Sequence, residues 1–453
     1  MKSYAFLAAF SLPALSATAY AQTTEELDAR LSAVERKLDA ILERLDESGE
    51  APPAIDAAAL REARSLIAAG AAQRAPASDK APPAPTSEAS SGLDGARVAL
   101  GGYVKLDLAA TRFTAGELPT TSIGRDFYIP SLVPAGGDGD GAVLDFNPRE
   151  TRVFFDVETH RSGHAIGGRI ELDFQVTTEG NERVSNSYVP RLRQAYFTYD
   201  NWLFGQAWTT FQNVSALPDN LDFIGPTEGV VFERQAQIRY SRGPWRFALE
   251  QPETEITIAD GTRRLPGDDI LPDVVLRYGR EGEWGGVTAA GIVRALHIEE
   301  DLAPGARKDT ALGYGVSLSG LVKSGGQDDF RMMLTAGRGI GRYVGLNIVN
   351  DASLDANGRI DTIGVLSGFL SYRHLWTRRL RSNLTGGFFF ADHPSMLSDS
   401  AVTDRVGSIH ANLIFSPVRA LDLGGELILA NRRTENGASG TMQRLQFSAK
   451  YGF

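Results

Sequence analysis

Strand-like segments with a period of two run through the sequence from residue 97 to its last residue, and this pattern constrains the fold more than any other feature. Residues 151–159, 168–176, 232–239 and 444–453 set apolar side chains against charged or polar ones at alternate positions. Successive side chains of a strand point to opposite faces, so each segment predicts a strand with one apolar and one polar face. Alternation alone does not say whether the apolar face points into a soluble core or out into a membrane.

The connections between these segments favour a membrane barrel. About sixteen strand-like segments can be counted, and the connections between them alternate between long and short. The long connections are residues 114–148, 179–189, 209–229, 259–270, 298–308, 339–358, 392–403 and 433–440. The short ones lie near Ser162-Gly163, Asp200-Asn201, Gly243-Pro244, Gly282-Glu283, Ser324-Gly325-Gly326, Trp376-Thr377 and Ser416-Pro417. Outer-membrane barrels have short periplasmic turns and long outer loops, whereas a sandwich has no reason for this asymmetry. We therefore predict an all-β fold for residues 93–453, a transmembrane antiparallel β-barrel of about 16 strands.

Both ends of the chain agree with a Gram-negative outer-membrane location. Residues 1–21 combine a basic start at Lys2, a short apolar run and the small residues Ala19 and Ala21, which predicts an export signal peptide. No later run reaches about 18 apolar residues, so helical membrane spans are not expected. The chain closes on an alternating strand with Tyr451 and terminal Phe453, an ending typical of bacterial outer-membrane barrels.

Residues 22–48 change the period from two to about 3.5. Leucine, valine and isoleucine recur at alternating spacings of four and three, at Leu27, Leu31, Val34, Leu38, Ile41 and Leu45. This pattern predicts a periplasmic α-helical coiled coil, and leucine at one core position with β-branched residues at the other favours three or four helices. The alternative is an amphipathic helix packed on its own domain. Residues 49–92 are rich in Ala and Pro and predict a short helix and a flexible linker.

Several segments in this order resemble one known family. The residues GYVKLD at 102–107, FNPRETRVFFDVET at 146–159, and LDFIGP with FERQAQIRY at 221–240 are similar to segments of the DcaP-like outer-membrane porins. Together with the N-terminal features, the resemblance covers nearly all of the chain after the signal peptide. It implies a homotrimer of sixteen-stranded barrels in outer-membrane lipid, a periplasmic N-terminal extension, and passive diffusion of small anionic solutes such as dicarboxylates or aromatic acids.

The polar strand faces then supply candidate residues lining a pore. Arginine binds carboxylates through two parallel hydrogen bonds, which makes it the side chain of choice for such solutes. The candidates on the wall are Arg152, Arg169, Arg193, Arg234, Arg239, Arg277 and Arg381. We expect the long connection before Val230 to fold inward as a constriction, with Arg193 and Arg239 in the wall opposite. Its apolar residues would pack on the wall, while Asp219, Asp222 and Glu228 would face water and supply the acidic side of a transverse field.

Other functions receive less support from the sequence. An outer-membrane hydrolase of the phospholipase or protease kind would need a nucleophile and a base, and Ser408 with His410 is the nearest candidate. A third alternative is an envelope tether or scaffold that acts through the coiled coil. His160 and His164 fit a surface turn better than a metal site. We expect no catalytic residues, cofactor, metal or nucleic-acid partner. The formal net charge of −10 does not by itself decide the selectivity of a pore.

Overall fold

The computed structural model describes residues 88–89, 96–139, 142–176, 185–258 and 260–453. The predicted signal peptide, the coiled coil and most of the linker lie outside these ranges, so their assignments stay predictions. The chain divides into two units, Met1–Pro76 and Ala77–Phe453, and the second contains the barrel. No helix within the described ranges is long and apolar enough to cross a membrane.

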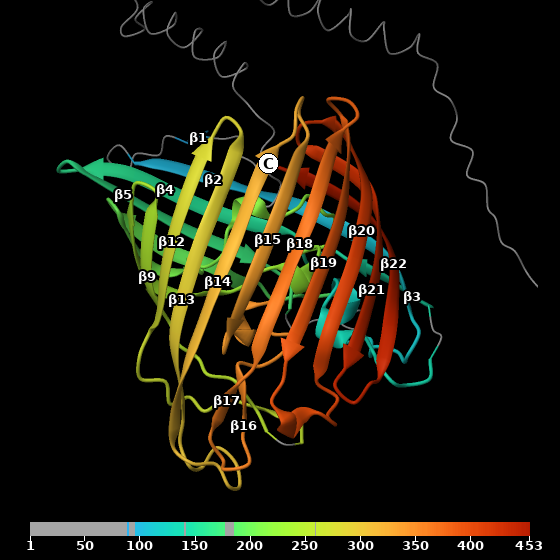
Figure 1. Ribbon diagram of the computed structural model, residues 1–453. Helices are drawn as coiled ribbons and strands as arrows, with labels where there is room; N and C mark the ends of the chain where they lie inside the picture. The colour runs from blue at the N-terminus through green and yellow to red at the C-terminus, as the bar shows by residue number, and fades with distance from the viewer. Residues whose placement is uncertain (1–87, 90–95, 140–141, 177–184, 259) are drawn as a thin grey trace, which may run out of the picture. The chain divides into compact units, whose positions relative to one another are not determined.

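Sixteen antiparallel strands close into a barrel, which confirms the predicted fold class (Figure 1). The first strand is β2 (Arg97–Phe113), and the second consists of two pieces, β3 (Ala142–Asn147) and β4 (Arg152–Arg161). The next seven are β5 (His164–Asp173), β6 (Arg191–Tyr199), β7 (Trp202–Trp208), β8 (Arg234–Arg242), β9 (Trp245–Glu250), β12 (Asp273–Gly282) and β13 (Gly285–Ile298). The last seven are β14 (Asp309–Lys323), β15 (Asp329–Arg338), β18 (Gly364–Leu375), β19 (Leu380–Asp392), β20 (Thr403–Val418), β21 (Leu421–Thr434) and β22 (Ser439–Gly452). The barrel closes where β2 pairs with β22, from Tyr103 opposite Gly452 to Phe113 opposite Met442. A short strand β1 (Glu88–Ala89) pairs with the start of β2.

The apolar face of most strands points out of the barrel and the polar face points in, as a membrane barrel requires. Leu106 and Leu445 are 46% and 45% exposed and lie on the outer face, whereas their neighbours Asp107 and Arg444 are buried inside. The same alternation recurs along most strands, with exposed Leu, Val, Ile and Phe outside and polar side chains inside. The apolar faces therefore point outward, as expected for strands in contact with lipid.

The end of the predicted long connection 114–148 was wrong, because residues 142–147 form β3 and the second strand is interrupted between β3 and β4. β3 pairs with the far half of β2 and β4 with its near half, while residues 148–151 form a turn in which Thr151 N donates to Pro148 O over 3.1 Å. Pro148 has no backbone N–H to offer a neighbouring strand, so the ladder breaks there. The break turns Glu150 inward, where its carboxylate pairs with the Lys105 ammonium.

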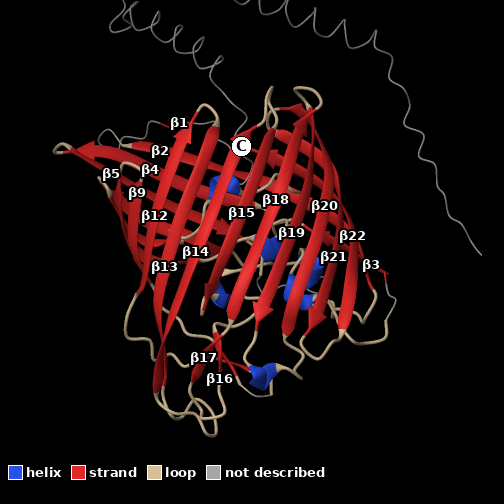
Figure 2. Ribbon diagram, viewed as in Figure 1, coloured by secondary structure: helices blue, strands red, loops and turns tan. Residues whose placement is uncertain are grey.

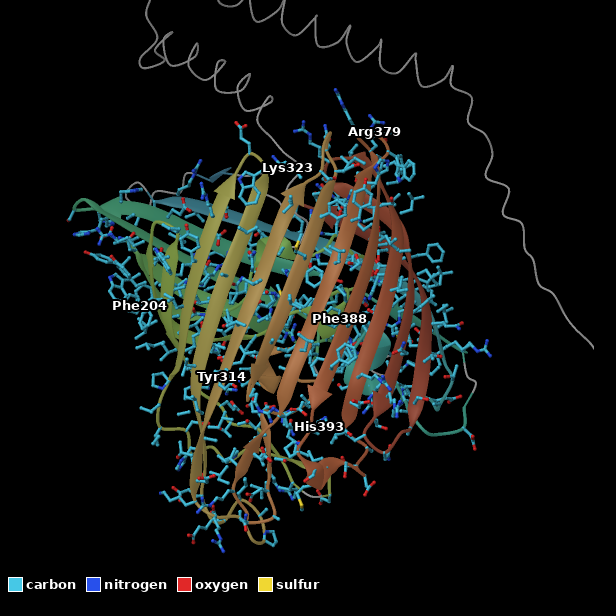
Figure 3. All side chains as sticks on the ribbon, in the orientation of Figure 1. Phe204, Tyr314, Lys323, Arg379, Phe388 and His393 are labelled. Atoms are coloured by element: carbon cyan, nitrogen blue, oxygen red, sulfur yellow. The ribbon has the colours of Figure 1, made fainter. Side chains whose placement is uncertain are left out.

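The two ends of the barrel differ as predicted. Every connection at one end is short, whereas most connections at the other are long, and Figure 3 places Lys323 and Arg379 at the first end and His393 at the second. Two details were wrong. Ser416-Pro417 lies within β20, because a bulge between Phe415 and Val418 accommodates the proline and moves the turn to Arg419-Ala420. The last outer connection shortens to residues 435–438, because β21 and β22 pair out to Arg433 opposite Ser439.

The long loops carry their own secondary structure. A four-stranded sheet joins β10 (Ile256–Thr257), β11 (Arg263–Arg264), β16 (Ala352–Leu354) and β17 (Ile360–Thr362), and β10 and β16 pair in parallel. Short helical turns are α3 (Ile123–Asp126), η1 (Pro130–Leu132), η3 (Val214–Ala216), η4 (Thr227–Gly229), η5 (Gly341–Tyr343) and η6 (Ser395–Leu397). Figure 2 shows several of these turns behind the front wall of the barrel.

Candidate functional site

Residues 209–233, the third loop, leave β7 and cross the barrel lumen before they reach β8. Side chains of the distant wall hold the loop backbone. Arg331 of β15 donates to Leu217 O over 2.7 Å, and Asn383 of β19 donates to Asp219 O over 2.8 Å. Asn412 of β20 donates to the same oxygen over 2.9 Å. Because buried backbone groups need partners, these amide and guanidinium side chains fix the position of a loop that has almost no secondary structure.

The end of the third loop packs on small residues of β18 and β19. A Cβ added at Gly387 would lie 2.5 Å from a carboxylate oxygen of Glu228, and one added at Gly229 would overlap the backbone of Gly368. Only glycine at these positions allows the loop to approach the wall so closely. The wall is therefore shaped to receive this loop.

The acidic residues of the third loop do not face water, so that expectation was wrong. Asp219, Asp222 and Glu228 are 3%, 1% and 0% exposed. Asp219 forms an ion pair with Arg381 at 2.6 Å, and Asp222 accepts hydrogen bonds from the backbone of Tyr128, Ile224 and Gly225. Burial raises the pKa of the Glu228 carboxyl above its ordinary value. Asp219 and Asp222 thus anchor the loop, and none of the three carboxylates adds exposed acidic surface to the lumen.

Two other loops share the lumen with the third loop. The first loop contributes Phe127 and Tyr128, and the sixth loop (residues 339–363) contributes Tyr343 and Val344. These side chains belong to the same buried apolar cluster as Phe223 and Val230 of the third loop. Phe232 N also donates to Tyr343 O over 2.9 Å. Side chains of these three loops therefore share one buried apolar core, which no local sequence pattern indicated.

Several of the predicted arginines are neutralised by carboxylates. Arg193 lies within 2.6 Å of both Glu171 and Asp173, and Arg169 forms two bonds of 2.7 Å with Asp156. Arg152 lies 3.8 Å from Glu171. Arg381 pairs with Asp219 and Asp422, and the guanidinium of Arg234 lies 4.8 Å from the centre of the Trp208 ring. Since carboxylates pair with Arg152, Arg169, Arg193 and Arg381, these four contribute less to the lumen field than their number suggests. Arg234 has aromatic contacts but no carboxylate within 4.0 Å in the described part of the chain.

Three other arginines form no ion pair with a carboxylate in the described part of the chain. Arg277 of β12 lies directly opposite Arg246 of β9, and Arg239 of β8 is close enough for Arg246 to repel it electrostatically. Within the described part of the chain, no carboxylate lies within 4.0 Å of any of the three guanidinium groups. Arg277 donates instead to Gln212 O of the third loop over 2.6 Å. We call Arg239, Arg246 and Arg277 the arginine ladder.

Arg246 was missing from the sequence-based candidates. The segment from Trp245 to Glu250 alternates, with Ala248 and Glu250 buried inside and Phe247 and Leu249 exposed outside. Residues an even number of positions apart in a strand share one face, so Arg246, four positions before Glu250, lies on the lumen face. This alternation is present in the sequence, but it extends over only the six residues of β9.

A cavity separates the third loop from the wall toward the end with the short turns. It brings together five of the predicted residues, Arg152, Arg193, Arg381, Asp219 and Asp222, and adds Lys105, Glu150, Asp422 and Lys450. Arg169, Arg234, Arg239, Arg277 and Glu228 do not line this cavity. Positive and negative groups are mixed in it, in contrast to the arginine ladder.

The candidate nucleophile Ser408 and base His410 do come together. Ser408 Oγ and His410 Nε2 are 3.0 Å apart, and His410 Nδ1 is 3.0 Å from a Glu426 carboxylate oxygen. All three residues are at most 5% exposed, and Glu426 accepts the backbone N–H of Leu221 in the third loop. A nucleophile needs access to its substrate, which this arrangement does not provide. The three residues act as an anchor for the third loop. Among the residues with described positions, no three His, Cys, Asp or Glu side chains form a group that could hold a metal.

Comparisons with known proteins agree with this architecture. The family model described as DcaP outer membrane protein matches residues 129–453. The crystal structure of the outer membrane channel DcaP of Acinetobacter baumannii is similar, with 24% identity and a TM-score of 0.66, over 79% of this chain and 98% of that one. OmpT of Vibrio cholerae, expressed in the outer membrane, has 10% identity and a TM-score of 0.47, over 81% of this chain and 100% of that one. OmpF of Salmonella typhi in complex with daunomycin also has 10% identity and a TM-score of 0.47, over 78% and 98%. No curated protein sequence matches this chain.

Proposed function

This chain belongs to the DcaP outer membrane protein family and is an outer-membrane channel, and we propose that it lets small anionic solutes cross by passive diffusion. The observation that carries the proposal is the arginine ladder of Arg239, Arg246 and Arg277. Three guanidinium groups on adjacent strands, with no carboxylate among the described residues within 4.0 Å of them, leave a positive strip on the lumen wall. A solute carboxylate can accept two parallel hydrogen bonds from such a group.

The field in the lumen outweighs the acidic charge of the whole chain. Charges further than about 10 Å from a solute are screened at physiological salt, whereas groups in a narrow, partly desolvated passage are screened much less. The formal net charge of −10 is spread over the entire chain. A local strip of three positive charges therefore sets the sign of the selectivity.

The third loop forms the constriction in this account. Ser215 is exposed, whereas the other residues of 209–233 are buried or half-buried. It follows Gln212 and Asn213, which accept hydrogen bonds from Arg277. The loop thereby touches the arginine ladder on one side and β19 to β21 on the other. We propose that solutes pass alongside this part of the loop, in contact with Arg239 and Arg246 of the ladder.

We propose the solute class and the assembly by analogy with the family that the chain belongs to. Dicarboxylates and aromatic acids fit the ladder, because two carboxylates can contact two neighbouring guanidinium groups. We propose a homotrimer, with the predicted coiled coil in the periplasm.

Block of the single-channel current by a dicarboxylate tests the binding part of the proposal. Succinate or phthalate added to purified channels in a planar bilayer should reduce the current in a concentration-dependent way. The triple variant R239Q/R246Q/R277Q should lose most of this effect. A matched control is R242Q/R280Q, because Arg242 and Arg280 lie on the exposed outer face of β8 and β12. Equal block in the triple variant and wild type would refute the role of the ladder.

A further inference from the structure

A second group of arginines lies on the outside of the barrel, at the end that carries the long loops. Arg405 of β20 and Arg433 of β21 stand directly opposite each other. Both side chains are about half exposed, at 46% and 48%. β20 begins just after the loop that starts at His393, which Figure 3 places at the long-loop end.

Strand parity places both arginines on the lipid-facing side. Along β20, Arg405 shares its face with Ile409 and Leu413, which are 54% and 51% exposed, while Val406 and His410 point inward and are buried. Arg433 shares the outer face of β21 with Leu429 in the same way. Phe390 of β19 lies opposite Arg405 and is 46% exposed. The two guanidinium groups therefore stand at the outer border of an apolar band, where lipid head groups begin.

The carboxylate of Asp404 lies near both arginines. A register shift between Thr403 and Arg405 turns Asp404 toward the pair, at 3.5 Å from Arg405 Nε and 3.9 Å from Arg433 Nε. Neither guanidinium donates a hydrogen bond to a protein acceptor in the described part of the chain. Two positive charges against one negative charge leave a net charge of about +1, and like charges directly across a strand pair are destabilising.

We propose that Arg405 and Arg433 bind a phosphate group of a lipid in the outer leaflet. A phosphate offers several acceptor oxygens to the N–H groups of both guanidinium groups that have no protein acceptor. The paired N–H groups of a guanidinium match the spacing of phosphate oxygens. The charge of the phosphate also removes the repulsion between the two arginines. Phe390 beside them and Ile409 and Leu429 further along the strands provide the apolar surface on which acyl chains of the same lipid lie. This inference requires only the outer-membrane location and does not rest on the proposed anion selectivity.

Native mass spectrometry of the purified full-length channel tests the proposal with lipid A carrying two phosphates. Wild-type protein should retain this lipid through detergent exchange, and R405Q/R433Q should bind it about tenfold more weakly, because charge-assisted contacts are lost. The control R242Q/R280Q removes two exposed outer-face arginines at the opposite end and should bind as wild type does. D404N removes the competing carboxylate and should bind about threefold more tightly.

Two further probes identify what is bound. Lipid A without phosphates should bind to wild type as weakly as lipid A binds to R405Q/R433Q. Inorganic phosphate at the same concentration should not displace the lipid, because it lacks acyl chains. Equal binding of both lipids to wild type, or equal binding of lipid A to wild type and R405Q/R433Q, would overturn the proposal. Loss of trimers in R405Q/R433Q with unchanged lipid binding would assign the pair to a contact between copies of the chain and would also overturn it. Heat-modifiable migration on gels confirms that each variant forms a barrel.

Discussion

Glu228 of the third loop lies directly against Gly387 of β19, where even a Cβ atom would come within 2.5 Å of its carboxylate. The glycine leaves room for Glu228 and for Pro226, which also contacts the same point. This contact joins the end of the loop to the wall on the far side of the lumen from β7 and β8. A side chain at position 387 therefore tests whether the position of the loop controls the pore.

Gly387→Leu should displace the end of the third loop and change the single-channel conductance by more than about a third. The reason is steric, because the new side chain would occupy the space of Glu228 and Pro226. Gly386→Leu is the matched control, since position 386 is exposed and a Cβ there meets only Ser408 O at 3.9 Å. Planar-bilayer recordings compare the two variants. Unchanged conductance in Gly387→Leu, in a barrel that folds as wild type does, would separate the loop from the constriction.

Glu426→Gln should loosen the third loop without abolishing the channel. Glu426 accepts hydrogen bonds from Leu221 N, Asn220 Nδ2 and Asn412 Nδ2, and it also contacts His410. Replacing the buried carboxylate with an amide removes charge-assisted bonds that contribute about 1.5–3 kcal/mol. The expected result is faster hydrogen exchange of the Leu221 amide, measured by mass spectrometry of the loop peptides. Glu435→Gln, in the outer turn after β21, should leave this exchange unchanged.

Ser408→Ala distinguishes an anchor from a catalytic nucleophile. Because Ser408 is 5% exposed beneath the third loop, we expect that its loss changes no hydrolytic activity toward phospholipid or peptide substrates. Channel recordings on the same preparation show that the protein is folded. A hydrolytic activity present in wild type and absent in both Ser408→Ala and His410→Ala would instead support the hydrolase alternative.

The outer loops should respond to pH through Glu255. Burial, followed by the nearby Asp351 carboxylate, raises the pKa of Glu255 from 4.5 to about 7, while Arg263, Arg342 and Asn347 oppose the shift. The folded loops therefore hold a proton that the unfolded segment releases at lower pH. The resulting stabilisation is complete below about pH 4.5 and is lost as pH rises through about 7.

Hydrogen exchange of residues 255–258 and 350–354, corrected for its intrinsic pH dependence, measures this effect. Protection should fall between pH 4.5 and pH 7 in wild type and stay level in Glu255→Gln. Asp260→Asn is a control in the same loop, because hydrogen bonds from Thr262 already lower the pKa of Asp260. A flat profile in wild type would contradict the assignment.

Deletion of residues 22–92 tests the coiled-coil prediction. If heptad helices hold three barrels together, the shortened protein should lose trimers on native gels at lower temperature than the full chain. Its single-channel conductance should persist, because the barrel residues are intact. Trimers of unchanged thermal stability would make this segment a tether or docking element.

The barrel itself could be predicted from the sequence because its signals are local. Turns at Ser162-Gly163, Asp200-Asn201 and Gly243-Pro244 follow from residues that favour left-handed or tight backbone conformations, and the structure has turns there. Ser416-Pro417 misled the prediction because a proline can also sit in a bulged strand. In both cases the deciding feature was the backbone requirement of one or two residues.

The interior could be predicted only in part. Parity identified which arginines point inward, but it could not tell that Arg193 meets Glu171 and Asp173 while Arg277 meets no carboxylate. That difference, which holds for the described part of the chain, depends on the register between strands. The shared core of Phe127, Phe223 and Tyr343 was even harder to predict from the sequence, because it joins three loops that are separated by about a hundred residues each.

The reversal potential of the wild-type channel under a potassium chloride gradient tests the central claim most directly. If the arginine ladder sets the lumen field, the potential should have the sign of a chloride-selective pore. R239Q/R246Q/R277Q should move it toward zero or to the cation-selective side, and R242Q/R280Q should leave it unchanged. A cation-selective wild-type channel, or a triple variant with the wild-type potential, would contradict the account.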